Sequence, residues 1–244
     1  MQLWITAEEC EDRSPGWLDQ AKDAAWRTAD GKPFIGRIDS RFGFAEVRVQ
    51  LNPDGTPAFA RLCCGEAPNI NAVVWGKTES GEIRIGVTVQ KRPLADSFEY
   101  SVPALEPFVF GQPYVGAFSE KLLLGEEAAE TYESAKGASI REAFEEAGVV
   151  DVINVTEMSF HNPNPTFVVT WSALFDVEVN LGTVTGQTDR SEGIYRCEYI
   201  PIGEVFSRIA QGEHEGISYR QATANDAFLV WLARHPEALA QAVS

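Results

Sequence analysis

Three glutamates, Glu142, Glu145 and Glu146, are spaced so that a helix would bring their side chains to one surface. Residues three and four apart are neighbours on a helix, where like charges repel by about 0.2–0.5 kcal/mol per pair. This crowding gains the fold nothing unless a cation lies among the carboxylates. Mg²⁺ takes oxygen ligands, often one or two carboxylates together with substrate phosphates. The spacing therefore indicates a Mg²⁺ or Mn²⁺ site, and the alternative is a solvated acidic helix face.

The residues around these glutamates predict a helix from Ser134 to Ala147. Alanines favour a helix, and Gly148 is well placed to end it. Arg141 precedes Glu145 by four residues, so its guanidinium can pair with a carboxylate and fix that side chain. Apolar residues at helical spacing are expected to face a core: Ile140, Phe144 and Ala147.

The wider pattern is a glutamate, a gap of seven residues and a charged block that ends in glycine: Glu133, Arg141, Glu142, Glu145, Glu146 and Gly148. This pattern resembles the signature of the Nudix hydrolases, in which several positions stand at fixed offsets. The resemblance implies that Glu142, Glu145 and Glu146 bind the metal. It makes Arg141 an orienting cation, Glu142 and Glu146 catalytic groups, and Glu133 an outer residue of the metal or water network.

Two positions depart from the family pattern. Where the family has a glycine six residues before the first glutamate, this chain has Glu127, and its nearest glycine is Gly125. The residue after Arg141–Glu142 is usually a larger aliphatic one, and here it is Ala143. We therefore expect an altered loop over residues 116–131, ahead of an intact helix.

Two further segments contribute candidate site residues. Gln90-Lys91-Arg92-Pro93 closes an expected strand and resembles the ADP-ribose-pyrophosphatase-like branch of the family, which implies substrate binding by Gln90 and Arg92. The polar loop 186–193 carries Glu192, and Asp189 as a second candidate, for the further glutamate that many relatives use as base or metal ligand. A solvated loop carboxylate is the alternative. The base is thus left open between Glu142 and this loop.

The order of expected strands and helices matches the resemblance over about residues 71–235. Strands are expected over 72–75, 83–89, 151–157 and 167–177, and an amphipathic helix over 226–234. The resemblance implies an α/β (α+β) fold, a Nudix-type α/β/α sandwich with a mixed sheet in residues 70–244. Residues 1–69 read as a β-rich N-terminal extension, because the Asn52–Gly55 turn separates two strand-like runs, 44–51 and 58–63.

Composition narrows the classes of partner. The formal net charge is −16, which argues against binding to nucleic acid or to an anionic membrane surface. The four cysteines, Cys10, Cys63, Cys64 and Cys197, form no metal-binding pattern and are expected to be buried free thiols. The N-terminal residues lack the basic and apolar blocks of a signal peptide, so a cytoplasmic protein is expected.

The resemblance implies a Mg²⁺-dependent hydrolase of the pyrophosphate bond in a nucleoside diphosphate linked to another moiety, such as ADP-ribose or a nucleotide sugar. Two alternatives stay open: a nucleoside triphosphate pyrophosphatase, and a non-catalytic module of the same fold that senses a nucleotide metabolite. The N-terminal extension also suggests a homodimer, because this part often packs across a two-fold axis in that branch of the family.

Overall fold

The computed structural model describes residues 4–21, 27–40, 43–66, 68–90, 114–116, 118–121, 135–161, 168–169, 172–185, 194–219 and 222–243. These residues form two compact units. The first contains the chain up to Pro68 together with Val168–Val169, and the second contains the rest. Whether residues 1–69 and 70–244 act as separate domains stays a prediction.

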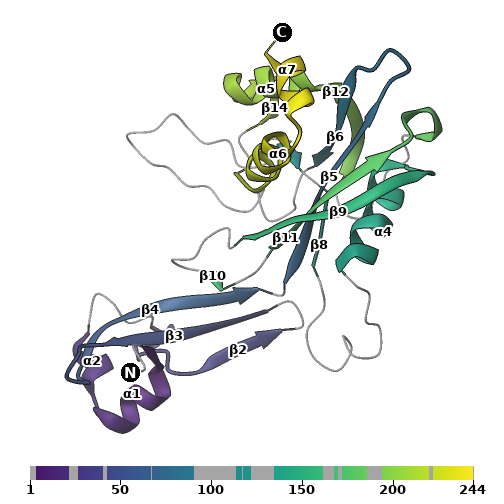
Figure 1. Ribbon diagram of the computed structural model, residues 1–244. Helices are drawn as coiled ribbons and strands as arrows, with labels where there is room; N and C mark the ends of the chain where they lie inside the picture. The colour runs from purple at the N-terminus through teal and green to yellow at the C-terminus, as the bar shows by residue number, and fades with distance from the viewer. Residues whose placement is uncertain are drawn as a thin grey trace. The chain divides into compact units, whose positions relative to one another are not determined.

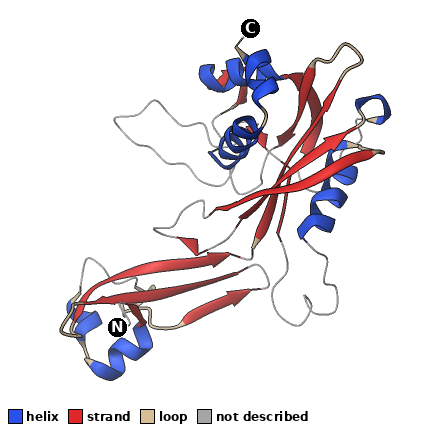
Figure 2. Cartoon of the chain, in the orientation of Figure 1, coloured by secondary structure: helices blue, strands red, loops and turns tan. Residues whose placement is uncertain are grey.

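The first unit is built on a sheet in the order β1-β3-β4-β10, with β2 paired to β3. Its elements are β1 (Trp4–Thr6), α1 (Ala7–Arg13), α2 (Trp17–Gln20), β2 (Arg37–Ser40), β3 (Gly43–Leu51), β4 (Pro57–Glu66) and β10 (Val168–Val169). The expected hairpin is present as β3 and β4, and Gly55 in its turn has the positive φ of 86° that glycine adopts without strain. Figure 2 shows the two short helices beside these strands.

Alternation along β3 separates the core of this unit from its polar side. Val47, Val49 and Leu51 are buried against residues of α1 and α2, including Cys10 and Leu18. Successive side chains of a strand point to opposite faces, so every second residue can face one core. Helix α1 begins at a capping box, in which Thr6 and Glu9 satisfy each other's backbone amides.

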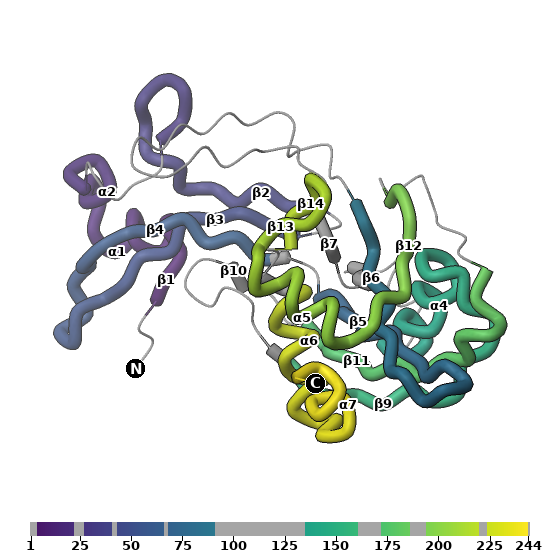
Figure 3. The backbone as a smooth tube through the Cα atoms, turned by 90° about the horizontal axis from the view of Figure 1, so that it is seen from above, coloured from purple at the N-terminus to yellow at the C-terminus, as the bar shows by residue number. Residues whose placement is uncertain are grey.

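The second unit contains a nine-stranded mixed sheet in the order β13-β14-β7-β6-β5-β11-β9, with β12 paired to β6 and β8 paired to β5. Its strands are β5 (Asn69–Lys77), β6 (Ile83–Gln90), β7 (Tyr114–Gly116), β8 (Phe118–Lys121), β9 (Val152–His161), β11 (Ser172–Val179), β12 (Ile194–Pro201), β13 (Glu213–His214) and β14 (Ile217–Ser218). Strands β5 and β11 run parallel at its centre. Figure 3 shows β12 beside β6.

Helices cover both faces of this sheet (Figure 1). They are α4 (Ala135–Ala147), α5 (Ile202–Gln211), α6 (Ala222–Arg234) and α7 (Pro236–Ala242), with a 3₁₀ turn at Leu181–Thr183. Val73 and Trp75 of β5 face a core shared with α5, α6 and α7, whereas Ala72 and Val74 face a core shared with α4. The expected α/β sandwich with a mixed sheet is therefore confirmed.

One expected strand differs from the structure. The apolar run 167–177 is two strands in two sheets: β10 pairs with β4 in the first unit, and β11 pairs with β5 and β9 in the second. Apolar residues suit either sheet equally, so hydrophobicity does not reveal where the chain changes sheets. In the described helices no segment is both long enough and apolar enough to cross a membrane.

Candidate functional site

Helix α4 carries the three glutamates and lies against the sheet through its smallest side chains. Ala138, Ala143 and Ala147 have no exposed surface and contact the core formed with β5 and β11. Alanines both favour a helix and allow its backbone to lie close to a sheet. Gly148 ends the helix with a φ of 62°, which glycine adopts without strain, and the Val149 amide just beyond it donates to the Ala143 carbonyl at 3.1 Å. The sequence-based prediction of this helix is confirmed.

The rotation of α4 about its axis is not the one expected from its apolar residues. Phe144, predicted to face the core, is 43% exposed, and the prediction for that side chain is wrong. Ala147 faces the core as predicted and Ile140 packs against it in part, whereas Ala143 takes the buried position expected of Phe144. The same rotation buries Glu142 and Glu146, which are 2% and 3% exposed, and leaves the Glu145 side chain half exposed. Two of the three carboxylates thus lie at the buried side of the helix.

Arg141 is the cation among these carboxylates. Its Nη1 donates to Glu142 Oε1 at 2.5 Å and to Glu145 Oε2 at 2.8 Å. A hydrogen bond between charged groups is about twice as strong as one between neutral groups, so the guanidinium offsets part of the desolvation of Glu142. The expected pairing of Arg141 with Glu145 is present, and the same nitrogen also contacts Glu142.

The sheet presents polar side chains toward α4 at the end of β6. The odd-numbered residues of β6 belong to the core on the other face, so Thr88 and Gln90 point to the α4 side. Both side chains are buried, and Gln90 Nε2 donates to Thr88 Oγ1 at 3.2 Å. Gln90 Oε1 is shielded from solvent and has no hydrogen-bond partner among the described residues. A buried carbonyl oxygen in this position is suited to accept a hydrogen bond from a ligand or water.

Cys197 on β12 links this polar strip to the helix. Its backbone is paired with Thr88, so the two side chains share a face of the sheet. Burial raises the pKa of the Cys197 thiol far above its ordinary value, and the nearby carboxylates of Glu146 and Glu198 raise the pKa further. The thiol therefore stays neutral beside Glu146. We use "α4 site" below for Glu142, Glu145, Glu146, Arg141, Thr88, Gln90 and Cys197.

The donor atoms of the α4 site fit a hard divalent cation in kind, since carboxylate and amide oxygens are the ligands that Mg²⁺ prefers. Across the part of the chain that the structure describes, no three acidic, histidine or cysteine side chains converge as a ready cation site. The Arg141 guanidinium contacts both Glu142 and Glu145, the place where a metal ion would share their oxygens. The roles of Glu142, Glu145 and Glu146 as metal ligands stay predictions.

Several predicted site residues lie outside the described residues: Glu133, Arg92, Glu192 and Asp189, together with Glu127 and most of the loop 116–131. Conversely, sequence reasoning missed Thr88 and Cys197. A signal for Thr88 was present, because it and Gln90 are the polar residues at alternate positions in an otherwise apolar strand end. Cys197 carried no such signal, since its neighbours in space come from α4 and β6. All four cysteines are free, as predicted, but their predicted burial holds only for Cys10, because the other three keep part of their surface exposed.

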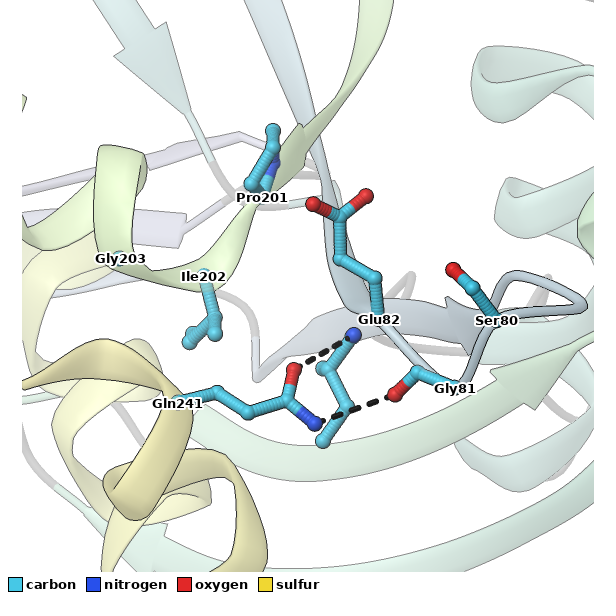
Figure 4. A pocket seen from close by; sticks show the side chains of 8 residues that line it. Ser80, Gly81, Glu82, Pro201, Ile202, Gly203 and Gln241 are labelled. Carbon is cyan, nitrogen blue, oxygen red and sulfur yellow. Dashed lines mark hydrogen bonds between the residues drawn. The ribbon is translucent and has the colours of Figure 1, made fainter. Parts of the chain in front are cut away.

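A hollow of about 390 Å³ lies away from α4, between the β5–β6 turn and helices α5 and α7 (Figure 4). Gln241 crosses it: its Oε1 accepts from the Ile83 amide at 2.9 Å and its Nε2 donates to the Gly81 carbonyl at 3.1 Å. The charged residue that lines it is Glu82, an anion. A hollow lined in this way is poorly suited to phosphate, which leaves the α4 site as the better candidate.

Comparisons with known proteins support the fold. No family model matches the sequence, and no curated protein matches it either. Among solved structures, the chain is similar to one described as "Crystal structure of ADP compounds hydrolase", with a TM-score of 0.53 and 11% sequence identity. The similarity covers 84% of this chain and 94% of that one. At this level of identity the likeness establishes that the two chains share a fold.

Proposed function

We propose that this protein is a Mg²⁺-dependent hydrolase that cleaves the pyrophosphate bond of a nucleoside diphosphate linked to another moiety. The observation that carries the proposal is the burial of Glu142 and Glu146 on one side of α4. Burying two carboxylates costs desolvation free energy, which a fold has no reason to spend unless the carboxylates have a function. The similar chain, an ADP compounds hydrolase, supports the same class of reaction.

The reaction needs charge neutralisation at the pyrophosphate, an activated water and an in-line geometry. A divalent cation bound by Glu142, Glu145 and Glu146 would supply Lewis-acid stabilisation of the developing negative charge. The protein's own contribution is to hold these carboxylates in place: α4 is fixed by its alanine face, and the Glu146 carboxylate lies beside a neutral thiol. A carboxylate within hydrogen-bond reach of the attacking water would accept its proton. Glu142 and Glu192 are proposed as this base, with Asp189 as a further candidate.

Arg141 has a defined part in this proposal. Without a metal ion, its guanidinium lowers the repulsion between Glu142 and Glu145 by donating to both. With the carboxylates neutralised by a bound divalent cation, the arginine would be available to orient a carboxylate or to contact the substrate's phosphates, for which a guanidinium is well suited. Glu133 is proposed as an outer group of the same network.

For the substrate we propose ADP-ribose or a nucleotide sugar. Gln90 ends β6 with a buried acceptor oxygen, and Arg92 follows two residues later in the sequence. An amide oxygen suits a hydroxyl or amino group, whereas an arginine suits a phosphate. Together they would bind a compound that carries both kinds of group. With a net charge of −16, we propose no nucleic-acid or membrane partner.

The proposal is tested by measuring phosphate release in a phosphatase-coupled assay. The panel contains ADP-ribose, nucleotide sugars and nucleoside triphosphates, each with and without Mg²⁺. We expect Mg²⁺-dependent cleavage of a nucleoside diphosphate derivative and a loss of at least about 100-fold in kcat for Glu146→Gln. Glu237→Gln, the same change at an exposed carboxylate on α7, is the matched control and should keep wild-type turnover. Wild-type turnover by Glu146→Gln in saturating Mg²⁺ would show that Glu146 is not part of the machinery.

One observation favours a second candidate, a non-catalytic module that senses a nucleotide metabolite. Arg141 already neutralises two of the carboxylates, as it would in a site that never binds metal. No cleavage of any compound on the panel, combined with binding of one of them, would favour this candidate. Preferential cleavage of triphosphates would instead favour a nucleoside triphosphate pyrophosphatase.

We also propose a cytoplasmic homodimer that associates through residues 1–69, the N-terminal extension. The expectation rests on the resemblance and on the general frequency of closed two-fold dimers. Light scattering at micromolar concentration measures the mass directly. The mass of a monomer there would rule out the dimer without affecting the proposed chemistry.

A further inference from the structure

Helices α6 and α7 meet at His235, whose ring lies in an aromatic setting on the face of the sheet opposite α4. The imidazole is stacked on the Trp231 indole, with centroids 4.3 Å apart and planes 18° from parallel. It meets the Trp75 indole edge-on at 5.0 Å. The His235 side chain is 13% exposed. These contacts fix the orientation of the ring and therefore the direction in which each ring nitrogen points.

Both ring nitrogens of His235 face hydrogen-bond acceptors. Nδ1 lies 2.8 Å from the backbone oxygen of Trp231, and Nε2 lies 3.2 Å from Asp176 Oδ2 on β11. A carbonyl oxygen can only accept, and an ionised carboxylate can only accept. A neutral imidazole has one N–H and one lone pair, so it satisfies one of these two partners and repels the other. The doubly protonated ring satisfies both.

The surroundings of Asp176 support this protonation state. The Trp75 Nε1–H donates to Asp176 Oδ1 at 2.5 Å, so the carboxylate accepts hydrogen bonds at both oxygens. The indole N–H and the imidazole therefore hold the carboxylate from two sides. Asp176 is the counter-ion of a positively charged His235, whose ring also contacts two indole rings, groups that attract a cation.

The position of His235 at a helix end adds to the same preference. It follows α6, a helix of 13 residues, and its Nδ1 bonds one of the free carbonyls of the last turn. Cationic side chains are stabilised there, by contact with these carbonyls and by the helix dipole.

Other charged groups near the ring oppose or support its positive charge. On the same strand as Trp75, Lys77 lies over that indole, and Arg234 at the end of α6 donates to the Met158 carbonyl of β9. Both are cations and oppose protonation, as do burial and the N-terminus of α7. Glu237 in the first turn of α7 and the Asp176 carboxylate of β11 support it. Asp176 is the group in direct contact, so its effect dominates.

We propose that doubly protonated His235 is a pH-sensitive clasp that holds the α6–α7 pair on the sheet. When the ring gives up one proton, a lone pair must face either the Trp231 carbonyl or the Asp176 carboxylate, and one of the two contacts is lost. Arg234 and Gln241 still tie the pair to β9 and to the β5–β6 turn. Loss of the clasp therefore loosens the helix pair over Trp75 without unfolding the sheet.

The direction of the pH effect follows from the protonation state of His235 that makes both contacts, which is the doubly protonated one. The clasp is complete at acidic pH and is lost as the pH rises through the titration of the ring. Histidine is the side chain whose charge ordinarily changes between about pH 5 and pH 8, and the clasp is therefore tested at pH values on either side of that range. The inference is independent of the chemistry proposed for the α4 site.

Hydrogen exchange of the whole protein, read by peptide mass, tests the clasp. Protection of residues 222–243 is compared at pH 5.5 and pH 8.5 after correction for the intrinsic exchange rate. We expect protection of the wild type to fall about ten-fold on raising the pH. His235→Gln should have the lower protection at both values, and His214→Gln, which changes a histidine on β13, should behave like the wild type.

A second variant keeps the test decisive if His235→Gln folds poorly. In Asp176→Asn the amide can donate to the lone pair of neutral His235, so protection should no longer fall as the pH rises. The proposal would be overturned if protection in Asp176→Asn fell with rising pH as much as it does in the wild type. An equal pH effect in wild type and His235→Gln would overturn it as well.

Discussion

The two faces of the large sheet are packed in opposite ways. On one face α4 lies on the sheet through alanines, and polar groups are buried beneath it: Glu142, Glu146, Thr88 and Gln90. On the other face α6 inserts Phe228 and Trp231, both fully buried, against Trp75. The second face holds the unit together by burying large apolar side chains. The first face contributes less apolar surface and carries charged groups, and it is the face to which the proposed chemistry belongs.

The largest effect is expected from truncating the stabilising face. Trp231→Ala removes a large side chain with no exposed surface, and such changes destabilise by about 3–5 kcal/mol through lost burial and a residual cavity. Urea unfolding followed by circular dichroism measures the change in free energy. If Trp231→Ala unfolds as the wild type does, α6 does not stabilise the sheet in the way described.

A smaller effect on stability, with a larger one on chemistry, is expected from overfilling the α4 face. Ala143→Leu forces extra methylene groups between α4 and the sheet, at a cost of about 1–3 kcal/mol. Because the helix must shift, Glu142 and Glu146 move with it, and turnover should fall more than stability predicts. Ala242→Leu, at a half-buried position on α7, is the control. Equal turnover in the two variants would show that turnover does not depend on the position of α4.

At the α4 face, the Cys197 thiol predicts a pH-dependent contribution to stability. Cys197 is half-buried near Glu146, and desolvation raises the pKa of its thiol in the folded protein above the unfolded value. The stability that this shift contributes is fully present below about pH 8.5, the ordinary range of a thiol, and is lost as the pH rises above it. Cys197→Ala should therefore flatten the decline in stability between pH 8 and pH 10.

Thermal melting over this range measures that difference. Cys10 and Cys63, whose thiol pKa values are also raised by burial, lie in the first unit and leave a residual slope. A slope in Cys197→Ala as steep as in the wild type would mean that the Cys197 thiol is not held neutral at the α4 site.

The smallest effect is expected at the exposed edge of the α4 site. Arg141→Ala removes the donor to both Glu142 and Glu145, and because the guanidinium is more than a third exposed we expect a change of about 1 kcal/mol or less. Adding Mg²⁺ should restore the lost stability, because a divalent cation neutralises the same carboxylates. Melting temperatures with and without Mg²⁺ measure both quantities. Failure of Mg²⁺ to restore Arg141→Ala would argue against a cation at this place.

The sequence predicted the features that depend on neighbouring residues, and it did not predict the features that depend on residues distant in the chain. Helix α4 followed from its alanines and Gly148, and the β3–β4 hairpin from the Asn52–Gly55 turn. The rotation of α4 was missed, because Phe144 is more hydrophobic than Ala143 and yet only the alanine allows close approach to the sheet. The division of residues 167–177 between two sheets, and the approach of Cys197 to Glu146, depend on distant partners that periodicity does not encode.

Calorimetric titration of Mg²⁺ or Mn²⁺ into the metal-free protein tests the central claim most directly, since it reads the α4 site without relying on a substrate. We expect saturable binding by the wild type and by Glu237→Gln, and at least a ten-fold weaker affinity for Glu142→Gln and Glu146→Gln. Binding of equal strength in all four proteins would place the metal elsewhere. No binding by the wild type, even with a nucleoside diphosphate present, would contradict the account of α4 as a metal site.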